Sequence, residues 1–139
     1  MRELVVSAEK KELEHVQAFI AEQLEALDCP KKIRFQIEIA VEEIFLNIVS
    51  YAYQPETGKA KVHCEVNEET LQISITFFDK GKPFDPLTQK EVDTSQEALL
   101  KREGGLGIFM VKKSMDDVSY RYEDGQNILT ICKSLKSLE

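Results

Sequence analysis

The sequence EIAVEEIFLNIVSYAY, which runs from Glu38 to Tyr53, has the spacing of an amphipathic helix. The preceding residues extend the predicted helix back to Pro30, because proline suits the first turn of a helix. One apolar stripe recurs at three- and four-residue intervals and comprises Ile37, Val41, Ile44, Ile48 and Tyr51. Further apolar residues lie off that stripe, so we expect burial on more than one side of the helix: Phe45, Leu46 and Val49.

Strand and helix patterns on either side of this helix complete the predicted order. A short strand over Arg2–Ser7 comes first, and Ser7 suits the N-cap of the helix that follows. A long polar segment over residues 80–104 resembles a lid, and a capping box at Thr94–Glu97 predicts a short helix inside it. A further helix opens at Gly105, and the remaining strands are expected near residues 62–66, 71–77, 118–122 and 127–133. Grouped helices and paired strands predict an α+β fold, a two-layer sandwich with a mixed, mostly antiparallel sheet and helices on one face.

Length and composition limit the classes of protein. A chain of 139 residues with 42% hydrophobic and 31% charged residues predicts one globular domain over residues 1–139. A net charge of -7 and a pI near 5.0 argue against nonspecific binding to nucleic acid or anionic lipid. No apolar run is long enough to span a membrane, and no signal peptide is recognised. Three cysteines without a CxxC pair indicate free thiols, so we expect a cytoplasmic protein.

The first candidate cluster is Glu43 with Asn47, which lie within about 40° of each other on the predicted helix. A carboxamide oxygen suits Mg²⁺, which takes few protein ligands and completes its shell with water and phosphate oxygens. A glutamate held beside it is able to orient or deprotonate a nucleophile. On spacing alone, a solvated polar stripe also explains the pair.

The second cluster begins at Asp79, which follows an apolar strand and opens the segment DKGKPFDP. An aspartate at a strand end is able to accept a hydrogen bond from the exocyclic amine of a purine. Gly81 would let the purine ring approach the backbone. An ordinary Asp-x-Gly turn gives the same pattern.

The third cluster is the glycine-rich segment Gly104–Gly107 at a predicted helix start, directly after Lys101 and Arg102. Free backbone N–H groups at a helix N-terminus bind anions, and the two cations would add to that attraction. The segment is neither a Walker A loop nor a dinucleotide-binding fingerprint. A flexible loop leading into a helix is the alternative.

In this order, the three clusters resemble the motifs of the GHKL ATPase superfamily, whose members have the Bergerat ATP-binding fold. The likeness is greatest to the anti-sigma-factor serine/threonine kinases of bacteria, and it covers essentially the whole chain. Glu38–Tyr53 is similar to that family's N box, the segment Asp79–Pro86 to its first glycine box, and Gly104–Val111 to its second.

The resemblance implies a role for each of these residues. Asn47 would bind the Mg²⁺ ion that bridges the triphosphate of ATP, and Glu43 would be the catalytic base. Asp79 would bind the adenine amine, and Gly81 would make room for it. Further ATP contacts are implied for a larger set, the last by a weaker match: Phe84, Arg102, Gly104, Gly105, Leu106, Gly107 and Thr130.

The resemblance also implies partners. The phosphoryl acceptor would be a serine of a small anti-anti-sigma protein with a STAS domain, a sigma factor would be sequestered, and the chain would form a homodimer. No contact with nucleic acid or a membrane is implied. The alternative function is a non-catalytic nucleotide-binding interaction module, which the presence of Glu43 disfavours. A histidine kinase needs a helix with a phospho-accepting histidine and gyrase-like or MutL-like ATPases need a transducer domain, for which we expect 139 residues to leave no room.

Overall fold

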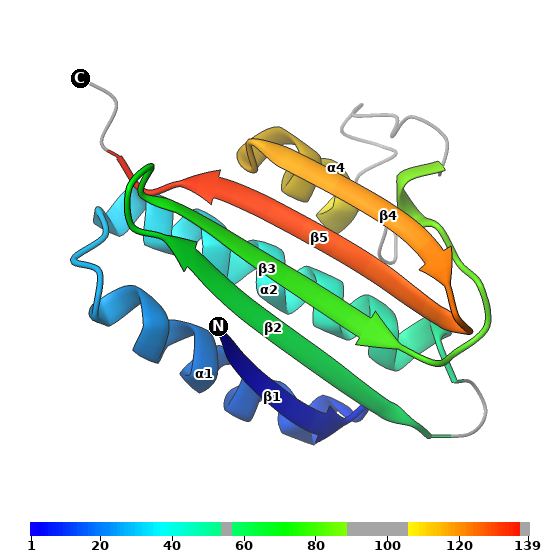
Figure 1. Cartoon of the computed structure of the whole chain (residues 1–139). Helices are drawn as coiled ribbons and strands as arrows, with labels where there is room; N and C mark the ends of the chain where they lie inside the picture. Colours follow the sequence, from blue (N-terminus) through cyan, green and yellow to red (C-terminus); the bar gives the residue numbers. More distant parts are fainter. Residues whose placement is uncertain (54–56, 89–105, 137–139) are drawn as a thin grey trace.

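The computed structural model of the chain describes residues 1–53, 57–88 and 106–136 (Figure 1). The elements in chain order are β1 (Arg2–Ser7), the 3₁₀ turn η1 (Lys10–Glu12), α1 (Leu13–Glu25), α2 (Lys31–Tyr51), β2 (Lys59–Asn67), β3 (Gln72–Asp79), the 3₁₀ turn η2 (Pro86–Thr88), α4 (Leu106–Ser114), β4 (Asp117–Glu123) and β5 (Gln126–Ser134). The predicted α+β class and element order are confirmed. The helix predicted around Thr94–Glu97 lies outside the described residues.

The described strands form one five-stranded sheet in the order β1-β2-β3-β5-β4. Every neighbouring pair is antiparallel, so this sheet is not mixed as predicted, because the strands follow one another through hairpins and antiparallel returns. Helices α1, α2 and α4 lie against one face of this sheet, which gives the predicted two-layer sandwich (Figure 1). No element of the described residues covers the opposite face. None of the helices in the described ranges combines the length and apolarity needed to cross a membrane.

The core lies between the helices and the sheet. Along β3, Ile73, Ile75 and Phe77 are almost fully buried, whereas the residues between them are half-buried on the other face. Asp79 continues the inward-facing alternation, so its position brings a carboxylate to the edge of the core. Helix α2 is buried along more than one stripe, as predicted, through Ile37, Ala40, Val41, Ile44, Phe45 and Ile48.

Two predicted helix boundaries differ from the structure. Helix α2 spans Lys31–Tyr51, with Pro30 as its N-cap, and is therefore slightly shorter than predicted. The prediction that Ser7 caps the first helix is wrong. Ser7 ends β1, its hydroxyl donates to Glu9 Oε2 at 2.7 Å, and α1 begins only at Leu13 after the η1 turn. Because Ser7 pairs with Lys59 in the sheet, it is held too far from the first turn of α1 to cap it.

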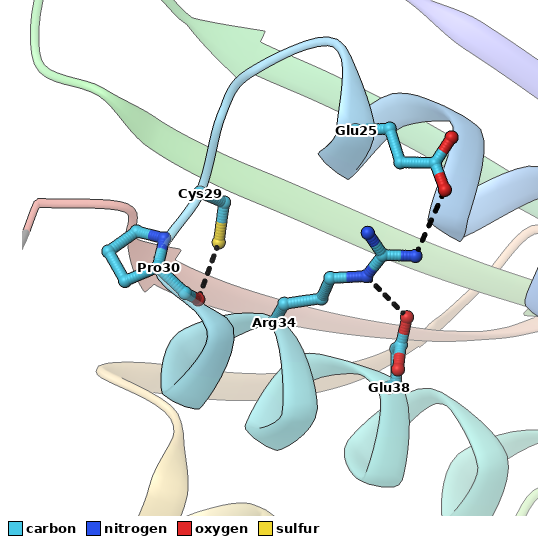
Figure 2. A network of polar contacts seen from close by, with 5 residues as sticks. All are labelled: Glu25, Cys29, Pro30, Arg34 and Glu38. Carbon is cyan, nitrogen blue, oxygen red and sulfur yellow. Dashed lines mark hydrogen bonds and ion pairs between the residues drawn. The ribbon is translucent and has the colours of Figure 1, made fainter.

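Arg34 links the first two helices (Figure 2). Its Nε donates to Glu38 Oε1 at 2.9 Å within α2, and a terminal nitrogen donates to Glu25 Oε1 of α1 at 3.3 Å. Beside this network, the Cys29 thiol donates to the Pro30 carbonyl at 3.4 Å, and burial raises the pKa of that thiol. The cysteines at positions 29, 64 and 132 are free, as predicted.

Tyr53 joins the end of α2 to two strands. Its hydroxyl donates to the Lys59 carbonyl at 2.6 Å and accepts from the Lys80 N–H at 2.7 Å. A Cβ added to Gly58 would lie 2.2 Å from the Tyr53 ring, so only glycine fits there without displacing that ring. These contacts fix the start of β2 and the exit from β3 relative to α2.

Candidate functional site

A cavity that is open to solvent lies between the C-terminal half of α2, the end of β3, the start of β5 and the neighbouring part of β4. Together with its open mouth it contains about 440 Å³ free of protein atoms. Its walls are mainly apolar, with a few polar groups that point inward. The lining residues are Ile44, Asn47, Ile48, Tyr51, Ala52, Phe77, Asp79, Phe84, Pro86, Tyr120, Asn127 and Leu129. An apolar cleft with a few convergent polar groups is typical of a small-molecule site.

Helix α2 supplies one wall. Ile44, Asn47, Ile48 and Tyr51 follow the three- and four-residue spacing that places side chains on one helical face. Asn47 therefore reaches the same cavity as Asp79, which comes from β3. Glu43 lies one turn before Asn47, is half-buried, and is not among the residues that line the cavity. Burial, and secondarily the charge of the adjacent Glu42, raise the pKa of Glu43 above its ordinary value.

Asp79 and Asn127 form the polar centre of the opposite wall. Among the described residues, these are the polar side chains that are buried, at 6% and 7% exposure. Asn127 Nδ2 donates to Asp79 Oδ1 at 2.9 Å, and the Gly81 N–H donates to the same oxygen at 3.0 Å. The hydrogen bonds of the described residues thus engage Oδ1 and leave Oδ2 available to a ligand. Burial raises the pKa of Asp79, and these two donors partly offset the rise.

Asn127 also holds the segment that follows β3. Its Nδ2 donates to the Lys82 carbonyl at 2.9 Å, and its Oδ1 accepts from the Phe84 N–H at 3.1 Å and from the Tyr120 hydroxyl. A single carboxamide therefore connects β3, β4 and the chain over Lys82–Phe84. Asn127 was not among the site residues predicted from the sequence. The sequence does contain a pattern that points to it. Asn127, Leu129 and Ile131 alternate along β5 and face inward, and a polar residue among apolar inward-facing neighbours indicates a functional site.

Tyr51 and Phe84 form an aromatic pair in the wall of the cavity. Their rings stack at a centroid distance of 5.5 Å and an interplanar angle of 24°. Tyr51 is 42% exposed and Phe84 is half-buried, so the pair presents apolar surface at the edge of the cavity. Planar aromatic surface of this kind suits a flat ring system.

Gly81 has a different role from the predicted one. A Cβ at this position would lie 2.2 Å from the Ala52 carbonyl oxygen and 2.6 Å from the Ala52 Cβ. The adjacent Lys82 N–H donates to the same carbonyl at 3.0 Å. The space that glycine leaves is therefore occupied by the end of α2, and Gly81 does not line the cavity.

We expect Gly81→Ala to destabilise the protein by about 3 kcal/mol, because the backbone of Ala52 would have to move. Thermal unfolding should show a melting temperature lower by roughly 10 °C. Gly125→Ala is the matched control, since a Cβ at Gly125 meets no atom within 4 Å and only its positive φ of 75° is strained. Equal melting temperatures for the two variants would contradict this role for Gly81.

Other predicted site residues are placed differently or fall outside the described residues. Thr130 does not reach the cavity: its hydroxyl lies 3.1 Å from that of Thr76 on the uncovered sheet face, while Leu129 points to the cavity. Alternation along β5 is the reason, because neighbouring residues point to opposite faces. Leu106 and Gly107 belong to the first turn of α4. Arg102, Gly104 and Gly105 lie outside the described residues.

The described residues contain no group of three or more His, Cys, Asp or Glu side chains that would hold a metal ion by themselves. Asn47 nevertheless fits a magnesium ion that is bound mainly through substrate phosphates, because such an ion needs only one or two protein oxygens. The cavity wall offers that carboxamide oxygen.

Comparison with known proteins gives a consistent result. A family model described as a histidine kinase-like ATPase domain matches residues 6–133. The chain is 33% identical over 98 residues to the serine-protein kinase RsbW of Listeria monocytogenes, covering 67% of this chain and 61% of that protein. It is 35% identical over 97 residues to RsbW of Staphylococcus aureus, covering 66% and 60%. The match thus spans about three-fifths of the length of these curated relatives.

Solved structures show the same fold at low sequence identity. A chain of the SiaB–SiaC complex from Pseudomonas aeruginosa superimposes with a TM-score of 0.64 at 15% identity, over 94% of this chain and 87% of that one. The histidine kinase AdeS of Acinetobacter baumannii gives a TM-score of 0.54 at 19% identity, over 99% and 70%.

Proposed function

Because the chain belongs to the histidine kinase-like ATPase domain family, we propose that it binds ATP and transfers the γ-phosphoryl group to a serine or threonine of a protein partner. The observation that carries this proposal is the buried Asp79–Asn127 pair, which leaves one carboxylate oxygen available in a cavity that also contains Asn47. The curated relatives named serine-protein kinases support the reaction class.

The adenine would bind against the β3 wall of the cavity. Asp79 Oδ2 would accept a hydrogen bond from the exocyclic amine. Asn127 would hold the carboxylate in place, because its Nδ2 donates to Asp79 Oδ1. The stacked rings of Tyr51 and Phe84 would contact the flat base. The phosphates would extend toward the start of α4, where Leu106 and Gly107 offer backbone N–H groups at a helix N-terminus. Arg102, Gly104 and Gly105 remain candidates for the same role.

Glu43 would act as the base on the other side of the phosphates. Its raised pKa makes it a better proton acceptor than an ordinary carboxylate, and its partial exposure keeps it accessible to a partner. In the proposed step, the partner's hydroxyl oxygen forms a bond to the γ-phosphorus, Glu43 takes the hydroxyl proton, and ADP leaves with the bridging oxygen. Mg²⁺ held by Asn47 would offset the negative charge of the phosphates.

The proposed partner is a small anti-anti-sigma protein with a STAS domain, whose serine accepts the phosphoryl group. We further propose that the chain binds a sigma factor or a similar regulator, forms a homodimer, and acts in the cytoplasm. A non-catalytic nucleotide-binding module is the alternative, and it predicts ATP binding without transfer.

The test combines binding and transfer. Calorimetry with ATP and with GTP should give binding of ATP that is at least about tenfold tighter, because guanine has a carbonyl oxygen at the position where adenine has the exocyclic amine that would donate a hydrogen bond to Asp79. Incubation with γ-labelled ATP, Mg²⁺ and a STAS protein encoded beside this chain should label that protein on serine or threonine. Absence of ATP binding at millimolar concentration would overturn the proposal, whereas binding without labelling of any STAS protein would favour the non-catalytic alternative.

We expect Asn47→Ala to weaken binding of ATP by about tenfold or more when Mg²⁺ is present, because the ion loses its protein ligand. Binding of ATP measured in EDTA should change little. Ser50→Ala, one turn further along α2 and exposed, is the control. An equal loss in Mg²⁺ and in EDTA would show that Asn47 contacts the nucleotide or supports the fold and does not hold the metal.

A further inference from the structure

The uncovered face of the sheet carries its charges in two separate rows. Side chains that are paired across antiparallel strands lie on the same face, so the strand register defines these rows. We define the basic row as Val5, Lys61, Phe78, Ile128 and Arg121. The central row is Glu3, His63, Thr76, Thr130 and Ser119, and the acidic row is Glu65, Ser74, Cys132 and Asp117.

The ionic groups of the two outer rows are mostly without partners. Within the described ranges, Lys61, Glu65 and Asp117 take part in no ion pair, and the Lys61 ammonium lies 4.6 Å from the centre of the Phe78 ring. Arg121 contacts Glu123 at 2.9 Å, with side chains 65% and 58% exposed, so solvent screens that pair.

Each end of the face extends the charge of its row. Lys59 and Lys80 lie beyond the basic row and line one surface depression together with Val5, Lys61 and Phe78. Glu68 and Glu69 lie beyond the acidic row and line another with Glu65. Glu123 of β4 lies at the same end as the basic row and contacts Arg121, so the positive charge of that end is concentrated over β2 and β3, whereas the other end is negative.

We infer that two copies of the chain pack these uncovered faces together, around a two-fold axis that runs across the strands along the central row. With such an axis, each strand lies over the equivalent strand of the other copy and runs in the opposite direction. Lys61 and Glu65 both lie on β2, two residues either side of His63. Arg121 and Asp117 both lie on β4, two residues either side of Ser119. Lys61 would thus face Glu65 of the other copy, and Arg121 would face Asp117 of the other copy.

The charges select this axis over the other possible one. A two-fold axis parallel to the strands would place the basic row of one copy on the basic row of the next, and like charges across an interface oppose association. The axis across the strands gives four attractive contacts per dimer. Two are between Lys61 and Glu65, and two are between Arg121 and Asp117.

The face also offers some apolar surface to an interface. Val5 is 54% exposed on β1, which is an edge strand of the sheet, and Phe78 is half-buried in the same row. Two sheets that pack face to face lie about 10 Å apart, so under this axis the Phe78 ring would lie over Ser74 of the other copy, since both residues lie on β3, two positions either side of Thr76. The inference rests on the homodimer in the proposed function and specifies its interface. The cavity is lined by α2 and by inward-facing residues of the sheet, so it lies on the helical side and is not covered by this interface.

Charge reversal tests this interface sharply. In Lys61→Glu/Arg121→Glu both outer rows are acidic, and in Glu65→Lys/Asp117→Lys both are basic. We expect each variant alone to raise the dimer Kd at least about tenfold in sedimentation equilibrium at low salt. An equimolar mixture of the two should recover dimers, and so should the variant that carries all four changes. Lys10→Glu/Lys32→Glu, which reverses two exposed lysines on the helical side, is the matched control and should dimerise normally.

The outcomes separate the interface from the function. A dimer that survives both double reversals would overturn this interface while leaving the homodimer intact. A monomeric wild-type chain would overturn both the interface and the homodimer. Neither result bears on the kinase proposal, because ATP binding is measured separately on the same variants. Circular dichroism of each variant distinguishes loss of pairing from loss of folding, and recovery in the mixture can only arise from complementary charge.

Discussion

Glu43→Gln should lower the rate of phosphoryl transfer to the partner by a factor of about 10² to 10⁴, which is the usual contribution of a general base. Glutamine has nearly the same shape as glutamate and cannot take a proton from the attacking hydroxyl. ATP affinity should stay within about threefold of the wild-type value, because Glu43 does not line the cavity. Single-turnover transfer and calorimetry measure the two quantities separately.

Glu42→Gln is the matched control for this experiment. Glu42 is adjacent on α2 and similarly half-buried, and its charge contributes to the raised pKa of Glu43. Its replacement should leave transfer within a few-fold of normal and should lower the pKa that governs the rate. A Glu43→Gln variant that phosphorylates at the wild-type rate would refute the assignment of the base.

Asp79→Asn should weaken ATP binding by about a hundredfold or more, and the variant should still fold. An asparagine oxygen is able to accept the hydrogen bonds that Asn127 and Gly81 now donate to Oδ1. The substitution therefore changes mainly the free atom, from an acceptor to an N–H donor. That donor would face the donor amine of adenine, and two unpaired buried donors are costly. Asp117→Asn, an exposed acid-to-amide change on β4, is the control for binding.

The same variant has a defined effect on stability against pH. Burial raises the pKa of Asp79 above its ordinary value of 3.8, so the folded state binds a proton more tightly than the unfolded state does. Between the ordinary and the raised value, the free energy of unfolding of the wild type therefore falls as the pH rises. In Asp79→Asn the free energy of unfolding does not fall in this way, because asparagine does not titrate. The free energy of unfolding of the variant minus that of the wild type should therefore be greater at pH 7 than at pH 4. A difference that is constant with pH would refute the link between Asp79 burial and stability.

The sequence was sufficient to predict the elements whose patterns are periodic. The stripes of α2 and the alternation of β3 follow from local spacing, and burial confirms both. The same spacing put Asn47 on the correct face of α2 and Asp79 at the end of an apolar strand, and the structure brings both to one cavity. Their roles in binding remain proposals.

The features that the sequence did not reveal depend on contacts between distant segments. Gly81 was interpreted as space for a ligand, but the space is taken by Ala52, which comes from a different element. Thr130 was implied by the resemblance to the family, whereas alternation along β5 points Asn127 and Leu129, and not Thr130, toward the cavity. Ser7 is of a residue type that favours helix N-caps, but its pairing with Lys59 of β2 prevents that role. Local composition does not encode which residues are brought together by folding.

The carboxamide of Asn127 has a consequence for folding kinetics. Its partner Tyr120 lies only seven residues away in the β4–β5 hairpin, whereas Asp79 lies 48 residues away. Hairpins close within microseconds, but joining distant strands requires closure of a long loop and comes later. A nucleotide that binds only after the hairpin has docked beside β3 stabilises a contact formed late. Such a ligand would slow the unfolding of the chain and leave its rate of folding nearly unchanged.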